Sequence, residues 1–148
     1  MTTTSSDGER RVGFTLPGDP IPAPRPRFRV IKLPGGKSTG SAYYAGKYKR
    51  YAKEAPKAIP ESPIYFDKGT PVVVYVTFFI GRPKKPVNKY PVGDLDNYVK
   101  AILDVITKNG TYWHDDAQVV YVNAVKSYTN EEPRTDVSIS ERRMPCEK

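Results

Sequence analysis

One unbroken run of apolar and β-branched residues, from Val72 to Ile80, does most to limit what this chain can fold into. Its sequence, VVVYVTFFI, offers almost no polar side to solvent, and residues of these types favour a strand. A strand that is apolar on both faces belongs inside a sheet, with neighbours on both sides. The run is too short to span a bilayer and contains a threonine. It therefore predicts the central strand of a sheet.

The other segments predict a small α+β fold around that strand. Alternating apolar residues indicate strands, and a 3.6-residue period indicates helices, the second of which ends at Asn109-Gly110. The further expected strands are residues 11–16, 28–33, 119–127 and 135–141, the last one short and near an edge. The expected helices are residues 45–59 and 95–108. The sheet is expected to be mixed or antiparallel, with these two main helices.

Length and end composition predict one folded domain between two tails. A chain of 148 residues fits a single domain. Residues 1–11 are predicted to be a disordered N-terminal tail without the apolar core of a signal peptide, residues 12–143 the domain, and residues 144–148 a C-terminal tail. The one cysteine, Cys146, excludes a disulfide framework and a thiolate zinc site and favours a reducing, cytoplasmic compartment.

The charge pattern points to an anionic partner, with nucleic acid first. The formal net charge is +8, and residues 20–53 hold nine Lys or Arg and no acid. Three arginines recur at every second residue of a proline-rich, extended segment and so fall on one side. Contacts of this kind with phosphates position a duplex without reading its sequence. The predicted phosphate contacts are Arg25, Arg27, Arg29, Lys84 and Lys85.

Four aspartates crowd together in this basic chain: Asp94, Asp96, Asp115 and Asp116. Like charges about 4 Å apart repel by roughly 1 to 4 kcal/mol near a surface, and a divalent cation with oxygen ligands relieves that repulsion. We expect the helix start and the following strand start to bring these carboxylates together, with Lys100 one turn after Asp96. Two metals about 3.5 to 4 Å apart can clamp the attacking and leaving oxygens of a phosphodiester, and a lysine can neutralise the growing charge.

Each of these residues also has a purely structural interpretation. Asp94 can cap the helix, and Asp96 can favour the helix dipole. Asp96 and Lys100 can form a surface ion pair, and Asp115 with Asp116 can form a turn. Their combination in one basic chain favours the metal site.

The residues from Asp94 to Val119 resemble a known family. The string DLDNYVKAILD, followed after a short gap by WHDDAQV, resembles the RusA-like Holliday-junction resolvases of bacteria and their phages. The proline- and arginine-rich PGDPIPAPRPR near the N-terminus is similar to that family's opening. One departure is Gly93, which stands where some relatives carry a basic residue.

The resemblance implies a homodimeric, Mg²⁺- or Mn²⁺-dependent endonuclease that nicks four-way DNA junctions symmetrically, with residues 12–143 as one RusA-like nuclease domain. Carried over by position, Asp94, Asp96 and Asp116 are the catalytic metal ligands, with Asp115 as an additional candidate. Lys100 is the catalytic lysine.

Residues near the aspartates are expected to have structural or supporting roles. Asp104, four residues after Lys100, is expected to orient that lysine. Trp113 is expected to anchor its turn by packing against the helix, and His114 to be a loop residue. Tyrosines beside lysines would suit single-stranded nucleic acid. The tyrosines concerned are Tyr43, Tyr44, Tyr48 and Tyr51. We expect Tyr48 and Tyr51 to line the core instead.

Two other functions stay open from the sequence: a non-catalytic basic protein that binds nucleic acid, and a nuclease of other branched DNA or of RNA. A four-way junction has two-fold symmetry, so paired nicks call for two identical sites in a C₂ dimer. The run at residues 72–80 and the second helix are candidate contributors to its interface.

Overall fold

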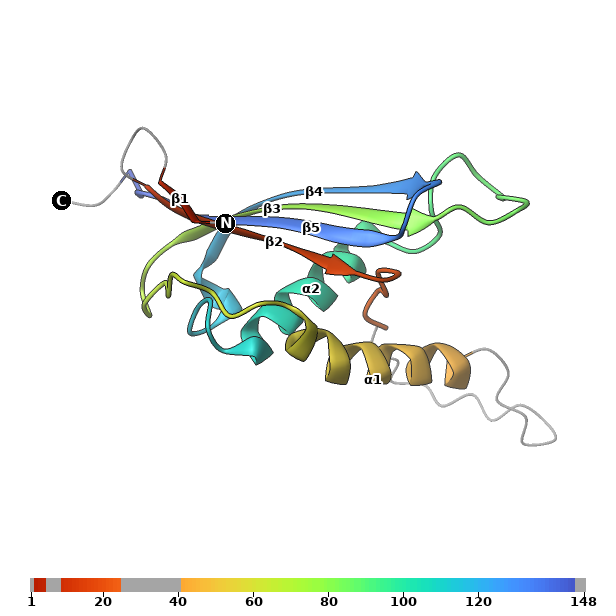
Figure 1. Cartoon of the computed structure of the whole chain (residues 1–148), viewed down its shortest axis with the longest axis horizontal. Coiled ribbons are helices and arrows are strands. Elements are labelled where there is room, and N and C mark those ends of the chain that lie inside the picture. The colour runs from red at the N-terminus through yellow and green to blue at the C-terminus, as the bar shows by residue number, and fades with distance from the viewer. Residues whose placement is uncertain (1, 5–8, 25–40, 146–148) are drawn as a thin grey trace.

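The computed structural model describes residues 2–4, 9–24 and 41–145, with the side chains of residues 9–24 and 46–145. Its elements follow in the order β1 (Thr2–Thr4), β2 (Arg10–Pro17), α1 (Ser41–Ala58), β3 (Val72–Gly81), α2 (Leu95–Asn109), the 3₁₀ helix η1 (Asp116–Gln118), β4 (Val119–Thr129) and β5 (Arg134–Glu141). The strands form one sheet, and both α-helices lie on the same side of it (Figure 1). The predicted α+β fold with two main helices is confirmed.

The position of β3 determines how the rest of the chain must run. The strand order is β1-β2-β5-β3-β4, and β3 is antiparallel to β5 but parallel to β4. The sheet is therefore mixed, and the prediction of a central strand at residues 72–80 is confirmed. A parallel pair needs a crossover that carries the chain back to the edge where the first strand began. Since α2 connects β3 to β4, it runs back along the sheet.

The core lies between the sheet and α2. The helix buries a face with the spacing i, i+3, i+4, i+7, i+8, namely Tyr98, Ala101, Ile102, Val105 and Ile106. This face packs against alternate residues of the strands, among them Val74, Val76 and Phe78 of β3. Burying one such side chain stabilises the fold by about 1.5 to 3 kcal/mol, so this layer fixes the helix on the sheet. Gly110, with φ 82°, ends α2 as predicted. Within the described residues no helix has the length and apolarity needed to cross a membrane.

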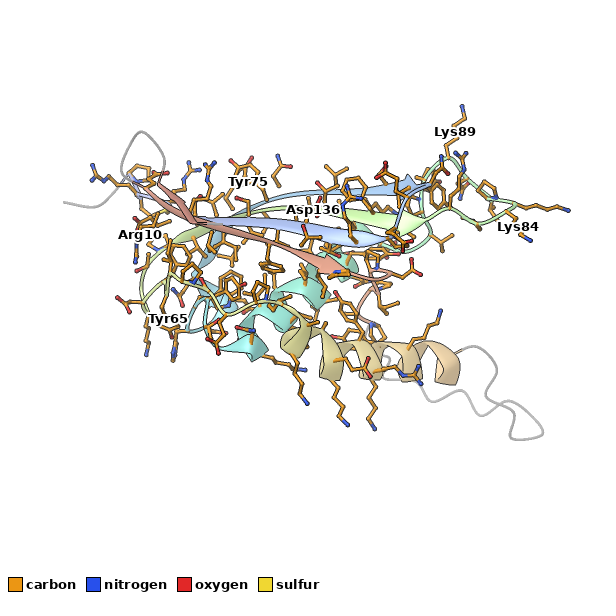
Figure 2. All side chains as sticks on the ribbon, in the orientation of Figure 1. Arg10, Tyr65, Tyr75, Lys84, Lys89 and Asp136 are labelled. Atoms are coloured by element: carbon orange, nitrogen blue, oxygen red, sulfur yellow. The ribbon has the colours of Figure 1, made fainter. Side chains whose placement is uncertain are left out.

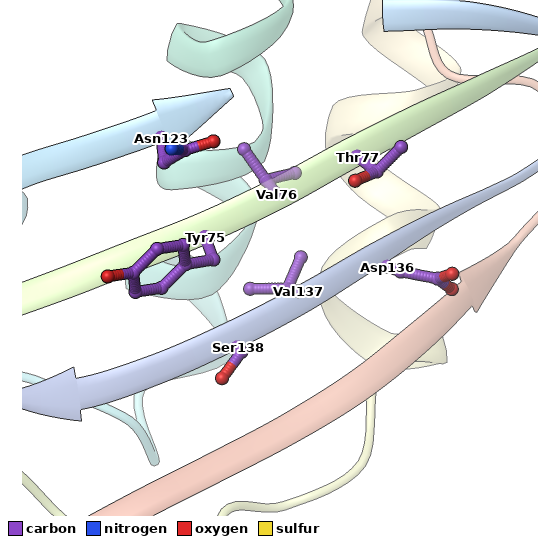
Figure 3. A pocket seen from close by; sticks show the side chains of 7 residues that line it. All are labelled: Tyr75, Val76, Thr77, Asn123, Asp136, Val137 and Ser138. Atoms are coloured by element: carbon purple, nitrogen blue, oxygen red, sulfur yellow. The ribbon is translucent and has the colours of Figure 1, made fainter. Parts of the chain in front are cut away.

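On the opposite face of the sheet, no helix formed by the described residues is present (Figure 1). Tyr75, Tyr121 and Val125 are exposed there. A depression on this face is lined by residues that include Tyr75, Asn123 and Ser138 (Figure 3). No predicted site residue lines it, so the candidate site lies elsewhere, around α2.

The structure corrects several expected elements. Residues 135–141 are not near an edge, because β5 pairs with β2 on one side and β3 on the other, and Thr135, Val137 and Ile139 face the core. The expected tail is wrong for Thr2–Thr4, which pair with Arg10–Val12. Helix α1 begins at residue 41 rather than 45. The strand expected at residues 28–33 lies outside the described residues.

Candidate active site

The first two predicted site residues, Asp94 and Asp96, stand at the start of α2. Asp94 has extended backbone, and its carbonyl accepts hydrogen bonds from the backbone N–H groups of Asn97 at 3.1 Å and Tyr98 at 3.3 Å. Its side chain makes no capping hydrogen bond to the helix. Ordinary helix capping therefore does not explain why a carboxylate occupies this position. Asp96 is exposed in the first turn.

The chain just before α2 is held by two side chains that sequence reasoning did not single out. Nζ of Lys126, on β4, donates to the carbonyl of Pro91 at 2.8 Å and to that of Gly93. The hydroxyl of Tyr98 donates to the carbonyl of Val92 at 2.8 Å. These bonds connect the helix start to both β4 and the body of α2.

The same close packing explains Gly93, the departure from the family pattern. This glycine has φ +102°, and a Cβ there would come within 3.0 Å of the Tyr98 ring. Glycine adopts such a conformation without a steric penalty. A basic side chain at this position would have to overcome both costs.

The turn that carries Asp115 and Asp116 is built around the buried side chain of Gln118. Its Oε1 accepts hydrogen bonds from the backbone N–H groups of His114 at 2.9 Å and Asp115 at 3.0 Å. The Asp115 carboxylate accepts one from the Asp116 N–H at 2.9 Å and forms a capping box with Gln118. Nε2 of Gln118 donates to three carbonyls of the segment before β3, those of Phe66, Asp67 and Thr70.

Trp113 anchors this turn to α2, as predicted. Its side chain is buried, and Nε1 donates to the hydroxyl of Thr107 at 2.8 Å. That hydroxyl in turn donates to the carbonyl of Leu103. The adjacent His114 is exposed in the loop.

Replacing Gln118 with leucine is expected to lower the free energy of unfolding by about 2 to 4 kcal/mol. The substitution removes every side-chain partner of two backbone N–H groups and three carbonyls. Urea unfolding followed by Trp113 fluorescence would measure the loss. Gln118→Glu keeps the acceptor for the N–H groups but loses the amide donor. Its free energy of unfolding should therefore lie between those of wild type and Gln118→Leu. Equal urea midpoints for wild type and Gln118→Leu would contradict this structural role.

Asp116 lies in surroundings that disfavour its charge. Burial raises the pKa of Asp116 above its usual value, the carboxylates of Asp115 and Asp104 raise it further, and the ammonium of Lys100 lowers it. Lys100 and Asp104 are one turn apart on α2. Lys100 and Asp104 are therefore close enough for their charges to act on Asp116.

Asp94 and Asp96 do not reach Asp116 within one protomer. Asp104, whose charge acts on Asp116, follows Asp96 by eight residues and Asp94 by ten, which is about 12 and 15 Å along a helix. Both lengths exceed the roughly 3.5 to 4 Å between the ions of a two-metal site, so Asp104 does not share such a site with Asp94 or Asp96. Among residues 9–24 and 46–145, no three His, Cys, Asp or Glu side chains form a group that could hold a metal ion.

The expectation that the helix start and the strand start meet is therefore not fulfilled within the protomer, and the parallel strands explain why. Asp94 follows the loop that leaves the end of β3 at Gly81, whereas Asp116 precedes Val119, which pairs with Val72 at the start of β3. Helix α2 spans the sheet between these two points (Figure 1).

The donor chemistry at both ends of α2 fits a divalent cation. The four predicted ligands are carboxylates, the hard oxygen donors that Mg²⁺ and Mn²⁺ prefer. Burial and then the neighbouring carboxylates raise the pKa of Asp116, and a bound cation would offset both effects by favouring the ionised carboxylate.

Of the predicted phosphate contacts, Lys84 and Lys85 are exposed on the loop of residues 82–93, and Figure 2 shows Lys84 at its far end. The arginines at positions 25, 27 and 29 lie outside the described residues. The described part of the proline-rich segment ends beside α2, because the N–H of Ala23 donates to the carbonyl of Asn97 at 2.9 Å.

The two tyrosines expected in the core are half-buried on α1. Burial raises the pKa of both Tyr48 and Tyr51, and the Asp104 carboxylate raises that of Tyr48 further. The side chains of Tyr43 and Tyr44 lie outside the described part of the structure.

A family model described as endodeoxyribonuclease RusA matches residues 17–140 of the chain. The match contains both α-helices, β3, β4 and all but the last residue of β5. It also contains every predicted site residue. No curated protein matches the chain.

Proposed function

Because the chain belongs to the RusA endodeoxyribonuclease family, we propose that it is a divalent-metal-dependent endonuclease that resolves four-way (Holliday) DNA junctions by paired, symmetric nicks. Membership confirms the resemblance noted in the sequence. The observation that carries the proposal is the placement of the DLDN and DDAQV carboxylates, with Lys100, inside the matched region of a chain of net charge +8.

The proposed catalytic residues are Asp94, Asp96, Asp116 and Lys100. The three aspartates, with Asp115 beside them, would hold Mg²⁺ or Mn²⁺, which supplies a Lewis acid and lowers the pKa of a bound water. Lys100 is exposed on α2, one turn from Asp96, and its ammonium would neutralise charge that develops on the phosphate oxygens. Asp104, one turn further along α2, would hold this lysine in place by its charge.

Phosphate contacts would bring the duplex arms to this site. Lys84 and Lys85 on the exposed loop, together with the arginines at positions 25, 27 and 29, are proposed to make them. The proline-rich segment that precedes these arginines is hydrogen-bonded to the first turn of α2. DNA phosphates bound beside this segment would lie near Asp94 and Asp96.

A homodimer would complete each active site and would also provide two active sites, one for each nick. Among the described residues of one protomer, no three of these carboxylates form a group that could hold a metal ion. Asp96, Lys100 and Asp104 follow one another at intervals of one turn on α2. A two-fold axis near Lys100 would therefore bring Asp96 of one protomer close to Asp116 of the other. We propose that each active site combines Asp94 and Asp96 of one copy with Asp115 and Asp116 of the second.

The test of the function is incubation of the protein with an immobile four-way junction and a matched linear duplex, with and without Mg²⁺. We expect paired nicks in the junction only, and only with the metal. Tight junction binding without cleavage in Mg²⁺ or Mn²⁺ would instead support a non-catalytic binding protein. Cleavage of flaps or RNA in preference to the junction would keep the nuclease and change its substrate.

A further inference from the structure

The loop between β3 and α2, residues 82–93, combines exposed apolar side chains with positive charge. It holds four basic residues and no acid. Val87 is 86% exposed, more than any other large apolar side chain in the described residues, and Val92 and Tyr90 follow at 69% and 58%. Figure 2 shows Lys84 and Lys89 extending away from the sheet at the end of this loop. An apolar residue so fully exposed between lysines contributes nothing to the core.

Both ends of the loop are tied to the folded body. At its start the N–H of Arg82 donates to the carbonyl of Thr129 at 3.1 Å. At its end Lys126 donates to the carbonyls of Pro91 and Gly93, and the Nζ of Lys126 lies 5.5 Å from the centre of the Tyr90 ring. Prolines within the loop restrict its backbone. The middle of the loop is therefore presented outward from a fixed base.

The charge of the loop selects a polyanion as the partner, and its exposed apolar side chains select an exposed apolar surface on that partner. A linear duplex hides the faces of its bases by stacking. At the branch point of an open four-way junction, the innermost base pairs each have one face without a stacked neighbour. In DNA-bending proteins of the minor groove, apolar side chains insert between base steps and contact the base faces that they unstack.

We propose that Val87 packs against base faces exposed at the branch point, while Lys84, Lys85 and Lys89 contact the flanking phosphates. This inference rests on the proposed junction-resolving function and adds a residue that distinguishes the junction from linear DNA. Because the loop ends at Gly93, next to Asp94, contact at the branch point would also set which phosphodiester meets the carboxylates.

The test compares Val87→Ser with the conservative variant Val87→Leu, in EDTA, on a junction that carries 2-aminopurine at the branch point and on a linear duplex. We expect Val87→Ser to bind the junction at least about tenfold more weakly, as suits the loss of one buried valine. Its affinity for the linear duplex should not change. Val87→Leu should bind both DNAs with wild-type affinity and give the same change in 2-aminopurine fluorescence on binding the junction.

A second variant separates this apolar contact from charge. Lys84→Ala should weaken binding to both DNAs and reduce the dependence of log K on log salt by about 0.9, with the 2-aminopurine signal at saturation unchanged. If Val87→Ser binds the junction as wild type does and gives the same change in 2-aminopurine fluorescence, the proposed contact is wrong. Cleavage of the junction in Mg²⁺ would still support the proposed function in that case. If wild type shows no preference for the junction at all, the proposed function itself fails.

Discussion

Four-way junctions incubated with Asp116→Asn in Mg²⁺ are expected to stay intact, with cleavage slower than wild type on the order of 1000-fold. Asparagine keeps the size of the side chain but removes the charge that would hold the cation. Asp94→Asn and Asp96→Asn should have the same effect. Single-turnover cleavage of a labelled junction measures the rate, and a gel-shift titration should show that binding survives, since losing a negative charge does not oppose contact with DNA.

Folding and charge controls distinguish lost chemistry from a damaged protein. The pKa of Asp116 is raised in the folded state, so at neutral pH the ionised carboxylate is disfavoured there. This cost is absent below the unfolded-state pKa and is fully present once the pH exceeds the folded-state pKa. Asp116→Asn should therefore melt no lower than wild type at pH 7. Asp136→Asn, the same change on the opposite face of the sheet, should cut junctions normally. Loss of binding with retained cleavage would overturn the assignment.

Local sequence patterns predicted most of the elements correctly because those patterns record which side of an element is buried. The run at residues 72–80 is apolar on both faces, and β3 is indeed an interior strand. The period of residues 95–108 matches α2 almost to the residue. In contrast, residues 135–141 are short and carry polar residues at alternate positions. That pattern describes a strand with one open face, and it does not say whether the strand has one partner or two.

The sequence names the residues of the candidate site, which stay a prediction, but it does not give their spatial arrangement. Nothing within residues 94–119 reveals that β3 and β4 are parallel, and that pairing alone sends Asp94 and Asp116 to opposite ends of α2. The motif also contains Gln118 without showing why, because the three carbonyls to which its amide donates lie about 50 residues earlier.

The supporting contact from Lys126 left a weak signal that could have been followed. Val122, Ala124 and Lys126 occupy alternate positions of β4, and the first two pack toward the core. A lysine that continues such a row points to a polar partner beneath the sheet. Its partners, the carbonyls of Pro91 and Gly93, belong to a loop whose path only the structure gives.

Mixing inactive Asp96→Asn with inactive Asp116→Asn is expected to restore cleavage. If each site takes Asp96 from one protomer and Asp116 from the other, a mixed dimer holds one intact site and one site that lacks both aspartates. With free subunit exchange half of the dimers are mixed, so about a quarter of the wild-type number of sites is recovered. Those dimers should make single nicks in place of paired ones. A denaturing gel of junctions with two differently labelled strands measures both quantities.

The matched control is a mixture of Asp94→Asn with Asp96→Asn, two variants that damage the same end of α2. In their mixed dimer each site keeps one defect, so this mixture should stay inactive if the sites are shared. Mass measurement of tagged and untagged copies would first establish that subunits exchange. Exchange without recovery in the Asp96→Asn and Asp116→Asn mixture would show that each site lies within one protomer. In that case α2 and the turn at Asp116 would have to rearrange when metal and DNA bind, because no three carboxylates among the described residues of one protomer form a group that could hold a metal ion.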